Sequence, residues 1–438
     1  MTYFLTRFFK LTEFDTTISR ELSAGFTTFL TMAYILFANP SILSGAGMDP
    51  ASSFLATCLV SAIGSALIGL IANYPIALAP GMALTVYFSY TIVQHLGYSW
   101  QSALGAVFIS GVLFLILTLT QIRRTILEAL PKQLCIAVSS GIGIFIGVVA
   151  LKNMGIVVFH SNAFATLGPV LSAQNALFLL GFVLIMLFER LHYRGSIALS
   201  ILIVSLLSLA LKLSTFHGVI ALPALHDTAW FAFDLKSLCN HQGITFILTF
   251  LMVALFDSTG TLVSLLHGSE LSKHPAHTHN ISRALVTESL ATIAASLLGT
   301  SSTSPYVESI AGIKAGGRTG LTAVTVSLLF LTAIFFSPLA RTIPTNAVSA
   351  GILFIAYLMT KNIKHIDWKG HPSDTLPCVI TLIMIPLTFS IAYGFGIGLL
   401  SYVILKILMR RTHELNAILL LLAVIFGGYF FCWLLGAL

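Results

Sequence analysis

The sequence predicts an all-α polytopic membrane protein, and three observations carry this prediction. Of the 438 residues, 57% are hydrophobic and only 8% are charged, whereas a soluble domain has about 25% charged residues. The mean hydropathy is +0.97. Apolar runs recur from one end of the chain to the other, and about 20 such residues suffice to cross a bilayer. We therefore expect a multi-pass protein of the cell membrane, surrounded by lipid.

The apolar runs divide the chain into about fourteen spans and one further C-terminal segment. Two of the spans are broken by proline and polar residues. The predicted segments are 22–39, 52–72, 73–95 (broken), 99–120, 135–152, 174–188, 196–213, 243–266, 284–299, 300–316 (broken), 318–336, 345–360, 375–390, 392–409 and 415–436. We interpret the last of these as an extra, peripheral helix.

The basic residues predict an orientation. If the N-terminus lies in the cytoplasm, all but four of the 22 lysines and arginines fall on the cytoplasmic side, as the positive-inside rule requires. The exceptions are Lys152, Lys212, Lys236 and Arg341. The formal net charge of +7 then reflects topology and does not indicate a nucleic-acid partner. The five cysteines have no metal-ligand spacing, so we expect neither a metal nor a cofactor.

Both broken spans contain an extended stretch at mid-membrane depth. Residues 300–306 read TSSTSPY, and Pro305 there lacks an N–H and disfavours helix before it. A short helix from about Val307 would lead back to the cytoplasm. Residues 74–80 read YPIALAP, and a helix from Gly81 would rise to the outer face. The two half-helices thus begin near the midplane and leave toward opposite faces.

This arrangement predicts a 7+7 inverted-repeat transporter fold. Residues 1–213 and 243–409 would each hold seven segments, in opposite orientations, with 214–242 as an outer connector. Inverted repeats with discontinuous helices are typical of secondary transporters. An enzyme is disfavoured, because the chain has neither an HExxH nor a GxSxG motif.

Two acidic residues lie near the membrane centre. Asp257 is mid-span, and Glu308 falls in the first turn of the second half-helix. A central acid costs about 2.5–3.5 kcal/mol on insertion scales, so two at one depth indicate a shared cavity. The alternatives are a packing hydrogen bond for Asp257 and a helix-dipole interaction for Glu308. Thr261 lies one turn beyond Asp257 on the same face, and Thr31 belongs to a partly polar first span.

Four stretches carry a resemblance to a known family. They are PIALAPGMALTVYF (75–88), FDSTGTL (256–262), GTSSTSPYVESIAGIKAGGRTGLTAV (299–324) and IPLTFSIAYGFGIGLLSYVILK (385–406). They resemble the purine permease branch of the nucleobase–cation symporter family, the azaguanine-resistance type that carries adenine, guanine and hypoxanthine. The resemblance extends over essentially the whole chain, and it implies the fourteen-span inverted-repeat fold of the uracil permease.

The resemblance implies a core domain of spans 1–4 and 8–11 and a gate domain of spans 5–7 and 12–14. In this chain the parts would be the core at 1–120 and 243–336, the gate at 121–213 and 337–438 with the peripheral C-terminal helix, and the connector at 214–242. It further implies import by proton symport, with the core sliding against the gate like an elevator. It places the protein in a bacterial inner membrane and leaves open a homodimer through the gate domain.

The resemblance also implies a substrate site between the broken spans. The acid of span 8 matches Asp257, and the glutamate of span 10 matches Glu308; either could carry the coupled proton. A carboxylate can accept hydrogen bonds from purine N–H groups, backbone N–H groups near Ala83 and Val307 can serve the ring acceptors, and aromatic side chains can flank the ring. The predicted substrate-binding residues are Thr31, Ala83, Thr85, Phe256, Asp257, Thr261, Tyr306, Val307 and Glu308.

One departure leaves the preferred purine open. The family branch usually reads Gly-Met-Gly-Leu-Asn at the start of the third half-helix, whereas this chain has Ala83 and Thr85 at the third and fifth of those positions. The asparagine is associated with substrate selection in the family. The alternatives are a transporter of another nucleobase or related solute and, less favoured, an anion exchanger of the same architecture, whose site should offer positive charge.

Overall fold

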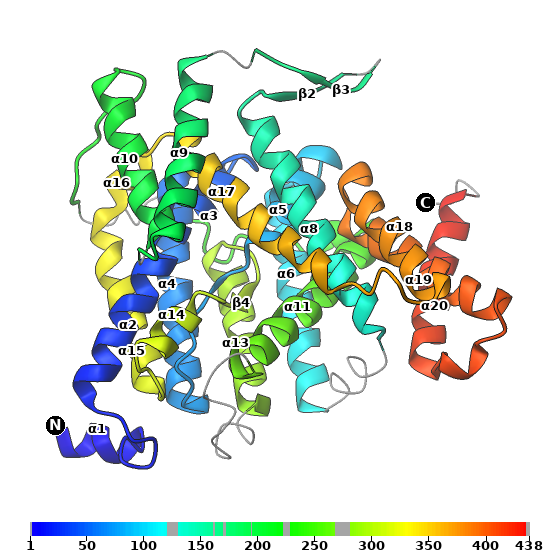
Figure 1. Cartoon of the computed structure of the whole chain (residues 1–438), viewed down its shortest axis with the longest axis horizontal. Helices are drawn as coiled ribbons and strands as arrows, with labels where there is room; N and C mark the ends of the chain where they lie inside the picture. Colours follow the sequence, from blue (N-terminus) through cyan, green and yellow to red (C-terminus); the bar gives the residue numbers. More distant parts are fainter. Residues whose placement is uncertain are drawn as a thin grey trace.

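The computed structural model shows a molecule built almost entirely of helices (Figure 1). It describes residues 2–120, 130–160, 163–169, 172–193, 195–221, 228–267 and 281–434. Within these ranges eight helical segments are long and apolar enough to cross a membrane, and four shorter apolar helices accompany them. The protein is therefore a multi-pass membrane protein.

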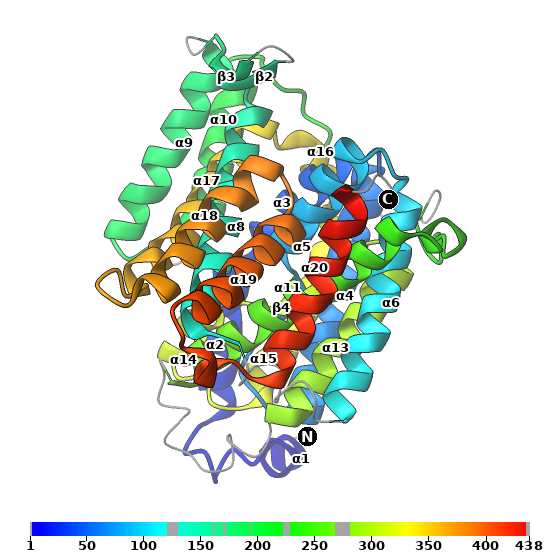
Figure 2. The same cartoon turned by 90° about the vertical axis from the view of Figure 1, so that its right-hand side faces the viewer.

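In chain order, the first half is a series of helices with a short hairpin between α8 and α9. Its elements are α1 (Thr2–Phe8), α2 (Ile18–Met32), α3 (Ile35–Ser44), α4 (Pro50–Leu67), η1 (Ile68–Ala72), β1 (Leu78–Pro80), α5 (Met82–Val86), η2 (Tyr87–His95), α6 (Trp100–Leu119), α8 (Lys132–Asn153), β2 (Val157–His160), β3 (Ala163–Leu167), α9 (Ala173–Arg190) and α10 (Ser196–Ala210). Both views place the β2–β3 hairpin at the end of the molecule opposite to the N-terminus (Figures 1 and 2).

The second half repeats the pattern and adds a last helix. Its elements are η3 (Lys236–Leu238), α11 (His241–His267), α13 (Ile281–Leu298), β4 (Thr303–Pro305), α14 (Ser309–Lys314), α15 (Gly320–Ala333), η5 (Ile334–Phe336), α16 (Ser337–Thr342), α17 (Thr345–Thr360), η6 (Lys361–His365), α18 (Pro372–Thr388), α19 (Ile391–Leu408), η7 (Thr412–Glu414) and α20 (Ala417–Leu434). The predicted C-terminal helix is thus present and packs beside α19 (Figure 2).

Three predicted boundaries need correction. The first span, predicted as one helix over 22–39, is interrupted at Ala33 and Tyr34 between α2 and α3. The half-helices begin later than predicted, because Gly81 takes an extended conformation before α5 and Glu308 occupies the position before the first residue of α14. Extended backbone therefore continues to Gly81 in the first broken span, whereas Val307 and Glu308 form a turn before α14 in the second.

The two broken spans are joined by a short antiparallel ladder. Strand β1 pairs with β4 in the register Leu78↔Pro305, Ala79↔Ser304 and Pro80↔Thr303. Two further backbone hydrogen bonds extend the ladder, from Gly81 N to Ser302 O at 2.8 Å and from Tyr306 N to Ala77 O at 3.0 Å. Each extended segment thus satisfies the other's backbone groups at a depth where water is absent.

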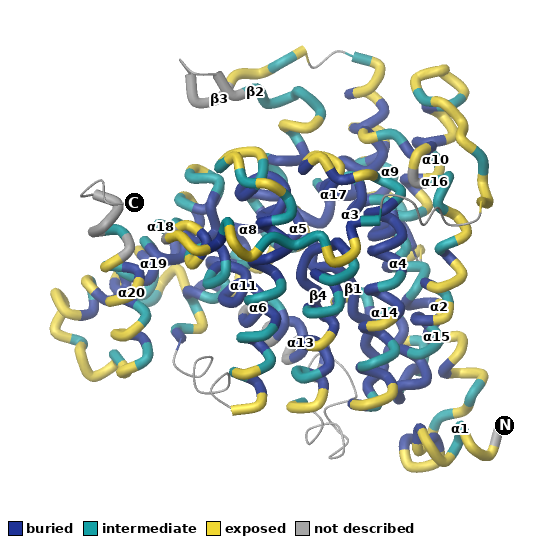
Figure 3. The backbone as a smooth tube through the Cα atoms, turned by 180° about the vertical axis from the view of Figure 1, so that it is seen from behind, coloured by how far each residue is buried: buried dark blue, intermediate teal, exposed yellow. Residues whose placement is uncertain are grey.

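Residues 77–81 and 302–306, which we call the crossing, lie in the centre of the molecule among buried segments (Figure 3). The Ser65 hydroxyl of α4 fastens the first of them, since it donates to Leu78 O and accepts from Leu78 N, each at 3.1 Å. The helices α11 and α13 pack against the second.

The hydroxyl side chains of residues 300–304 all have partners, which explains their density in a membrane segment. Thr300 accepts a hydrogen bond from the Asn39 side-chain amide at 3.0 Å. Ser301 shares a hydrogen bond with the Thr85 hydroxyl at 2.5 Å. Asn39 in turn accepts from Thr85 at 2.8 Å, so hydrogen bonds link these four residues in one chain.

The remaining three hydroxyls reach α13 and α11. The Thr292 hydroxyl of α13 lies 3.3 Å from that of Ser302 and 3.0 Å from that of Thr303. The Ser304 side chain forms a hydrogen bond with Asp257 of α11. Extended backbone and side-chain hydroxyls are therefore satisfied together, as buried polar groups must be.

The helices pack as two groups. In one group α15 contacts α2 and α4, α13 contacts α4 and α6, and α11 contacts α6; in the other α8 contacts α17 and α18, and α9 contacts α10 and α17. The first group surrounds the crossing. The grouping follows the predicted spans of core and gate, and the functional division into these two domains remains a prediction.

An ion network anchors the C-terminal helix. The Lys406 ammonium of α19 is fully buried and pairs with Asp374 at 2.8 Å and with Glu414 at 2.5 Å. Arg411 joins both carboxylates, at 3.5 and 2.5 Å. The hydrogen bond from Lys406 holds the pKa of the Glu414 carboxyl below its ordinary value. Glu414 lies three residues before the start of α20, so the network anchors the turn that leads into that helix.

A close approach of two glycines supplies the first prediction. A Cβ added at Gly320, the first residue of α15, would collide with the backbone of Gly69, and backbone cannot rotate away as a long side chain can. Gly320→Ala should therefore lower the unfolding temperature and the yield of folded protein. The measurement is thermal unfolding of the detergent-solubilised protein. Gly428→Ala is the control, because nothing lies within 4 Å of a Cβ there; equal behaviour of the two variants would contradict the packing.

Candidate functional site

The candidate site is formed by the crossing, the first residues of α5 and α14, and the middle of α11. Glu308 lies at its edge, as the residue before α14. The hydroxyl of Tyr34, at the joint between α2 and α3, donates a hydrogen bond to the Glu308 carboxylate at 2.7 Å. The Thr31 hydroxyl lies 3.4 Å from the Glu308 carbonyl oxygen and 2.8 Å from the carbonyl of Thr28 in its own helix. The first span and the second broken span thus meet at Glu308.

Asp257 approaches the same place from α11. Its carboxylate forms a hydrogen bond with Ser304 of the crossing. Tyr306 lies within electrostatic reach of both Asp257 and Glu308, and the two carboxylates also lie within reach of each other. The Tyr306 hydroxyl itself donates to Pro80 O at 2.6 Å, so this side chain joins the two broken spans. The structure therefore brings both predicted acids close to the crossing and within electrostatic reach of each other.

The other predicted residues occupy different environments. Val307 is half exposed beside Glu308. Ala83 lies in the first turn of α5, where backbone N–H groups have no partner inside the helix. Thr85 is fully buried, and its hydroxyl contacts Asn39, Ser301 and the Gly81 carbonyl. Thr85 therefore lies behind the crossing, in the network with Asn39.

Two predicted residues of α11, Thr261 and Phe256, give little further information about the site. Thr261 is buried one turn beyond Asp257. The side chain of Phe256 lies outside the described residues. Neither residue changes the position of the candidate site.

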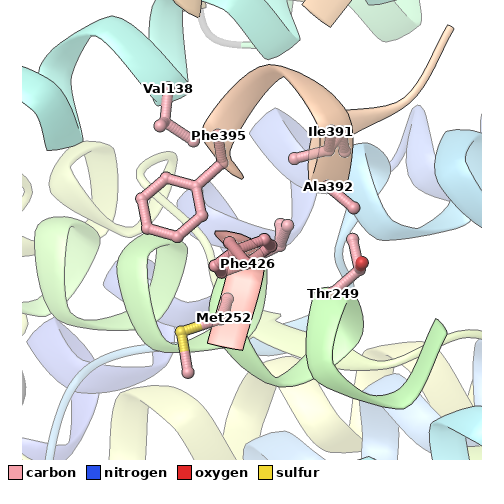
Figure 4. Close-up of a pocket in the computed structure, with 8 residues that line it drawn as sticks. Val138, Thr249, Met252, Ile391, Ala392, Phe395 and Phe426 are labelled. Atoms are coloured by element: carbon pink, nitrogen blue, oxygen red, sulfur yellow. The ribbon is translucent and has the colours of Figure 1, made fainter. Parts of the chain in front are cut away.

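A small pocket close to α11 contains none of the predicted residues (Figure 4). It is lined by Val138, Thr249, Met252, Val253, Ile391, Ala392, Phe395 and Phe426. Thr249 is its single polar side chain, and Val253 lies one helical turn before Asp257 on α11. Specific recognition of a polar ligand requires several placed polar groups, so we place the candidate site at the crossing.

Three contact residues are absent from the predicted site, namely Tyr34, Asn39 and Ser304. A signal for Asn39 existed, because it is an amide in the apolar run ILFANPSIL (35–43), and buried amides need partners. No sequence signal could pair Tyr34 with Glu308, since 274 residues separate them.

Comparisons with known proteins place this geometry in context. Residues 19–397 match the model of a permease family, Xan_ur_permease. The chain is 38% identical over 423 residues to the adenine permease AdeQ of Escherichia coli (strain K12), an alignment that covers 97% of this chain and 95% of that protein. It is 36% identical over 437 residues to the guanine/hypoxanthine permease PbuG of Bacillus subtilis (strain 168), covering 97% and 98%.

A solved structure shares the fold. The transmembrane domain of the cyanobacterial bicarbonate transporter BicA superposes with a TM-score of 0.66 at 15% sequence identity, covering 86% of this chain and 96% of that domain. The predicted 7+7 inverted-repeat fold with two broken spans is thereby confirmed. The match over most of its length and the close relatives show that the chain belongs to the Xan_ur_permease family of permeases.

Proposed function

We propose that this protein imports purine nucleobases, namely adenine, guanine or hypoxanthine, by proton symport. The observation that carries the proposal is a pair of carboxylates, Asp257 and Glu308, at the crossing of two broken spans in a chain whose relatives include an adenine permease and a guanine/hypoxanthine permease. Transport of a nucleobase is the part that the relatives support directly. The choice of purine and the coupling to protons are the finer parts of the proposal.

The chemistry of the site suits a purine. A purine presents N–H donors and ring acceptors on a flat apolar body. The Glu308 carboxylate can accept from an N–H group, and the backbone N–H groups at the start of α5 near Ala83 and beside Val307 can serve the acceptors. Tyr306 contributes an aromatic face. Asp257 and Glu308 are the acids at the crossing that could take up the coupled proton.

The anion transporters of the same fold provide the rival reading. A shared fold does not determine the substrate, and BicA is only 15% identical to this chain. An inorganic anion would meet two carboxylates here, and like charges repel strongly away from water. The carboxylates therefore favour a ligand that offers hydrogen-bond donors.

Thr85 contributes to this function through the crossing. Its hydroxyl is committed to Asn39, Ser301 and Gly81, so we expect it to set the position of the first half-helix relative to the second broken span. Asparagine at this position would offer both a donor and an acceptor. In this chain the amide next to the Thr85 hydroxyl is that of Asn39.

We further propose that the core group of helices moves against the gate group during transport. Polar contacts between the two groups, formed by residues of η2, support this. The Tyr90 hydroxyl of η2 exchanges hydrogen bonds with the Asn153 amide at the end of α8, at 2.9 and 2.6 Å. The Thr91 hydroxyl donates to the carbonyl of Phe389, between α18 and α19, at 2.6 Å. Such few polar contacts can break and re-form during a sliding motion.

Glu308→Gln tests direct binding. Losing a charged hydrogen-bond partner typically costs more than about 1.4 kcal/mol, so affinity for the transported purine should fall at least about tenfold. The measurement is uptake of radiolabelled purine competed by adenine, guanine and hypoxanthine in turn. Glu13→Gln is the control, because Glu13 is exposed and pairs only with Lys10 among the described residues. Unchanged uptake affinity in Glu308→Gln would remove this residue from the site.

Asp257→Asn tests proton coupling. The amide keeps the shape of the side chain and can still bond Ser304, but it cannot take up a proton. Accumulation against a gradient should therefore fall more than exchange of labelled for unlabelled purine. The experiment compares both activities across pH in proteoliposomes, with Asp367→Asn in an exposed loop as control. An unchanged pH dependence with full accumulation would exclude Asp257 as the coupling group.

A cross-link tests the sliding motion. Tyr90 and Asn153 are replaced by cysteines in a variant that lacks the five native cysteines and retains uptake. A short bifunctional thiol reagent then joins the core group to the gate group. Uptake should stop on cross-linking. The matched pair replaces Tyr98 and Gln242, whose side chains form a 2.6 Å hydrogen bond inside the core group. Continued uptake with a fully cross-linked core–gate pair would contradict the motion.

A further inference from the structure

Tyr34 is fully buried at the interruption of the first span, between the last residue of α2 and the first of α3. Its hydroxyl donates to Oε1 of Glu308 at 2.7 Å. Among the described residues, this is the side-chain hydrogen bond that the Glu308 carboxylate receives. Besides its own backbone N–H, the carboxylate is therefore held by a side chain from the opposite repeat.

We propose that Tyr34 is a positioning residue that orients the Glu308 carboxylate toward the transported base. The inference rests on the proposed function, because it concerns how the substrate-binding carboxylate is held. With one carboxylate oxygen bonded to Tyr34, the side chain loses rotational freedom before the ligand arrives. A preorganised acceptor binds more tightly than one that must be ordered on binding.

The neighbouring hydroxyl groups form hydrogen bonds with other partners, whereas the Tyr34 hydroxyl bonds the Glu308 carboxylate. Tyr306 donates to the Pro80 carbonyl at 2.6 Å. Thr31 bonds to carbonyls of its own helix at 2.8 and 3.3 Å, and it approaches the backbone of Glu308 rather than its side chain. The phenol of Tyr34 is thus the group placed to set the direction of the carboxylate.

The base of the Tyr34 side chain is itself fixed. Five residues further on, in α3, the Asn39 amide donates to Thr57 of α4 at 2.8 Å and to Thr300 at 3.0 Å. The helix α3 is therefore tied to the neighbouring helix and to the segment that leads into β4. Tyr34 immediately precedes α3, so these bonds restrict how far its backbone can move relative to the crossing.

The test begins with Tyr34→Phe, which keeps the buried ring and removes only the donor. Binding of labelled adenine, guanine and hypoxanthine to the purified protein should weaken about tenfold for the preferred base. In uptake assays the KM should rise while the maximal rate per folded transporter changes little. Tyr98→Phe is the matched control, because it loses a comparable 2.6 Å hydrogen bond to Gln242 away from the site. Unchanged affinity in Tyr34→Phe would overturn the proposal.

A double-mutant cycle then separates positioning from other roles. Combined with Glu308→Ala, the Tyr34→Phe change should have no further effect on affinity, because the carboxylate it orients is gone. A second loss of similar size would show that Tyr34 acts independently of Glu308 and would overturn the proposal. Where Glu308→Ala binds too weakly to measure, the same four proteins are compared by thermal unfolding without ligand; additive shifts would equally overturn it.

Failure of the proposed function has a different signature. If the unaltered protein binds none of the three bases, the transport proposal fails and Tyr34 has no substrate carboxylate to position. The unfolding cycle still reports whether Tyr34 and Glu308 are coupled. Normal base binding with no coupling between the two residues would refute the positioning role alone.

Discussion

The structure depends on one constraint, which is that backbone N–H and C=O groups in the middle of a membrane must find partners inside the protein. Two spans are not helical at that depth, and they meet the constraint together through the β1–β4 ladder. The hydroxyl-rich stretch follows from the same requirement, since its side chains bond α11, α13 and the first span instead of water. The candidate site lies where this backbone and the two carboxylates meet.

Much of the fold was predictable from composition and proline placement. The spans, the extended stretches and the C-terminal helix follow from apolar runs and from residues such as Pro80 and Pro305, which act locally. The joint at Tyr34 was not predictable, because residues 32–37 (MAYILF) contain neither glycine nor proline. The depth of Asp257 and Glu308 could be estimated from helix geometry. The hydrogen bond between Tyr34 and Glu308 could not be predicted, because the two residues are 274 positions apart.

The relatives and the shared fold answer different questions. At 15% identity the bicarbonate transporter domain shows that the backbone can be built with very different side chains. The permeases share 36–38% identity with this chain over nearly its whole length, and this similarity supports the proposed transport of a nucleobase. The shared fold leaves the substrate class open, because a fold does not determine its function.

The ladder between β1 and β4 also constrains how the protein is made. Leu78 pairs with Pro305, so the first broken span has no backbone partner until more than half of the chain has been synthesised. Until then its extended residues must remain in contact with water or with the insertion machinery, since lipid would leave their polar groups unpaired. The first half cannot complete its own structure, and assembly of the centre is a late event that requires both repeats. Quality control during biogenesis would therefore act on the pairing of the halves.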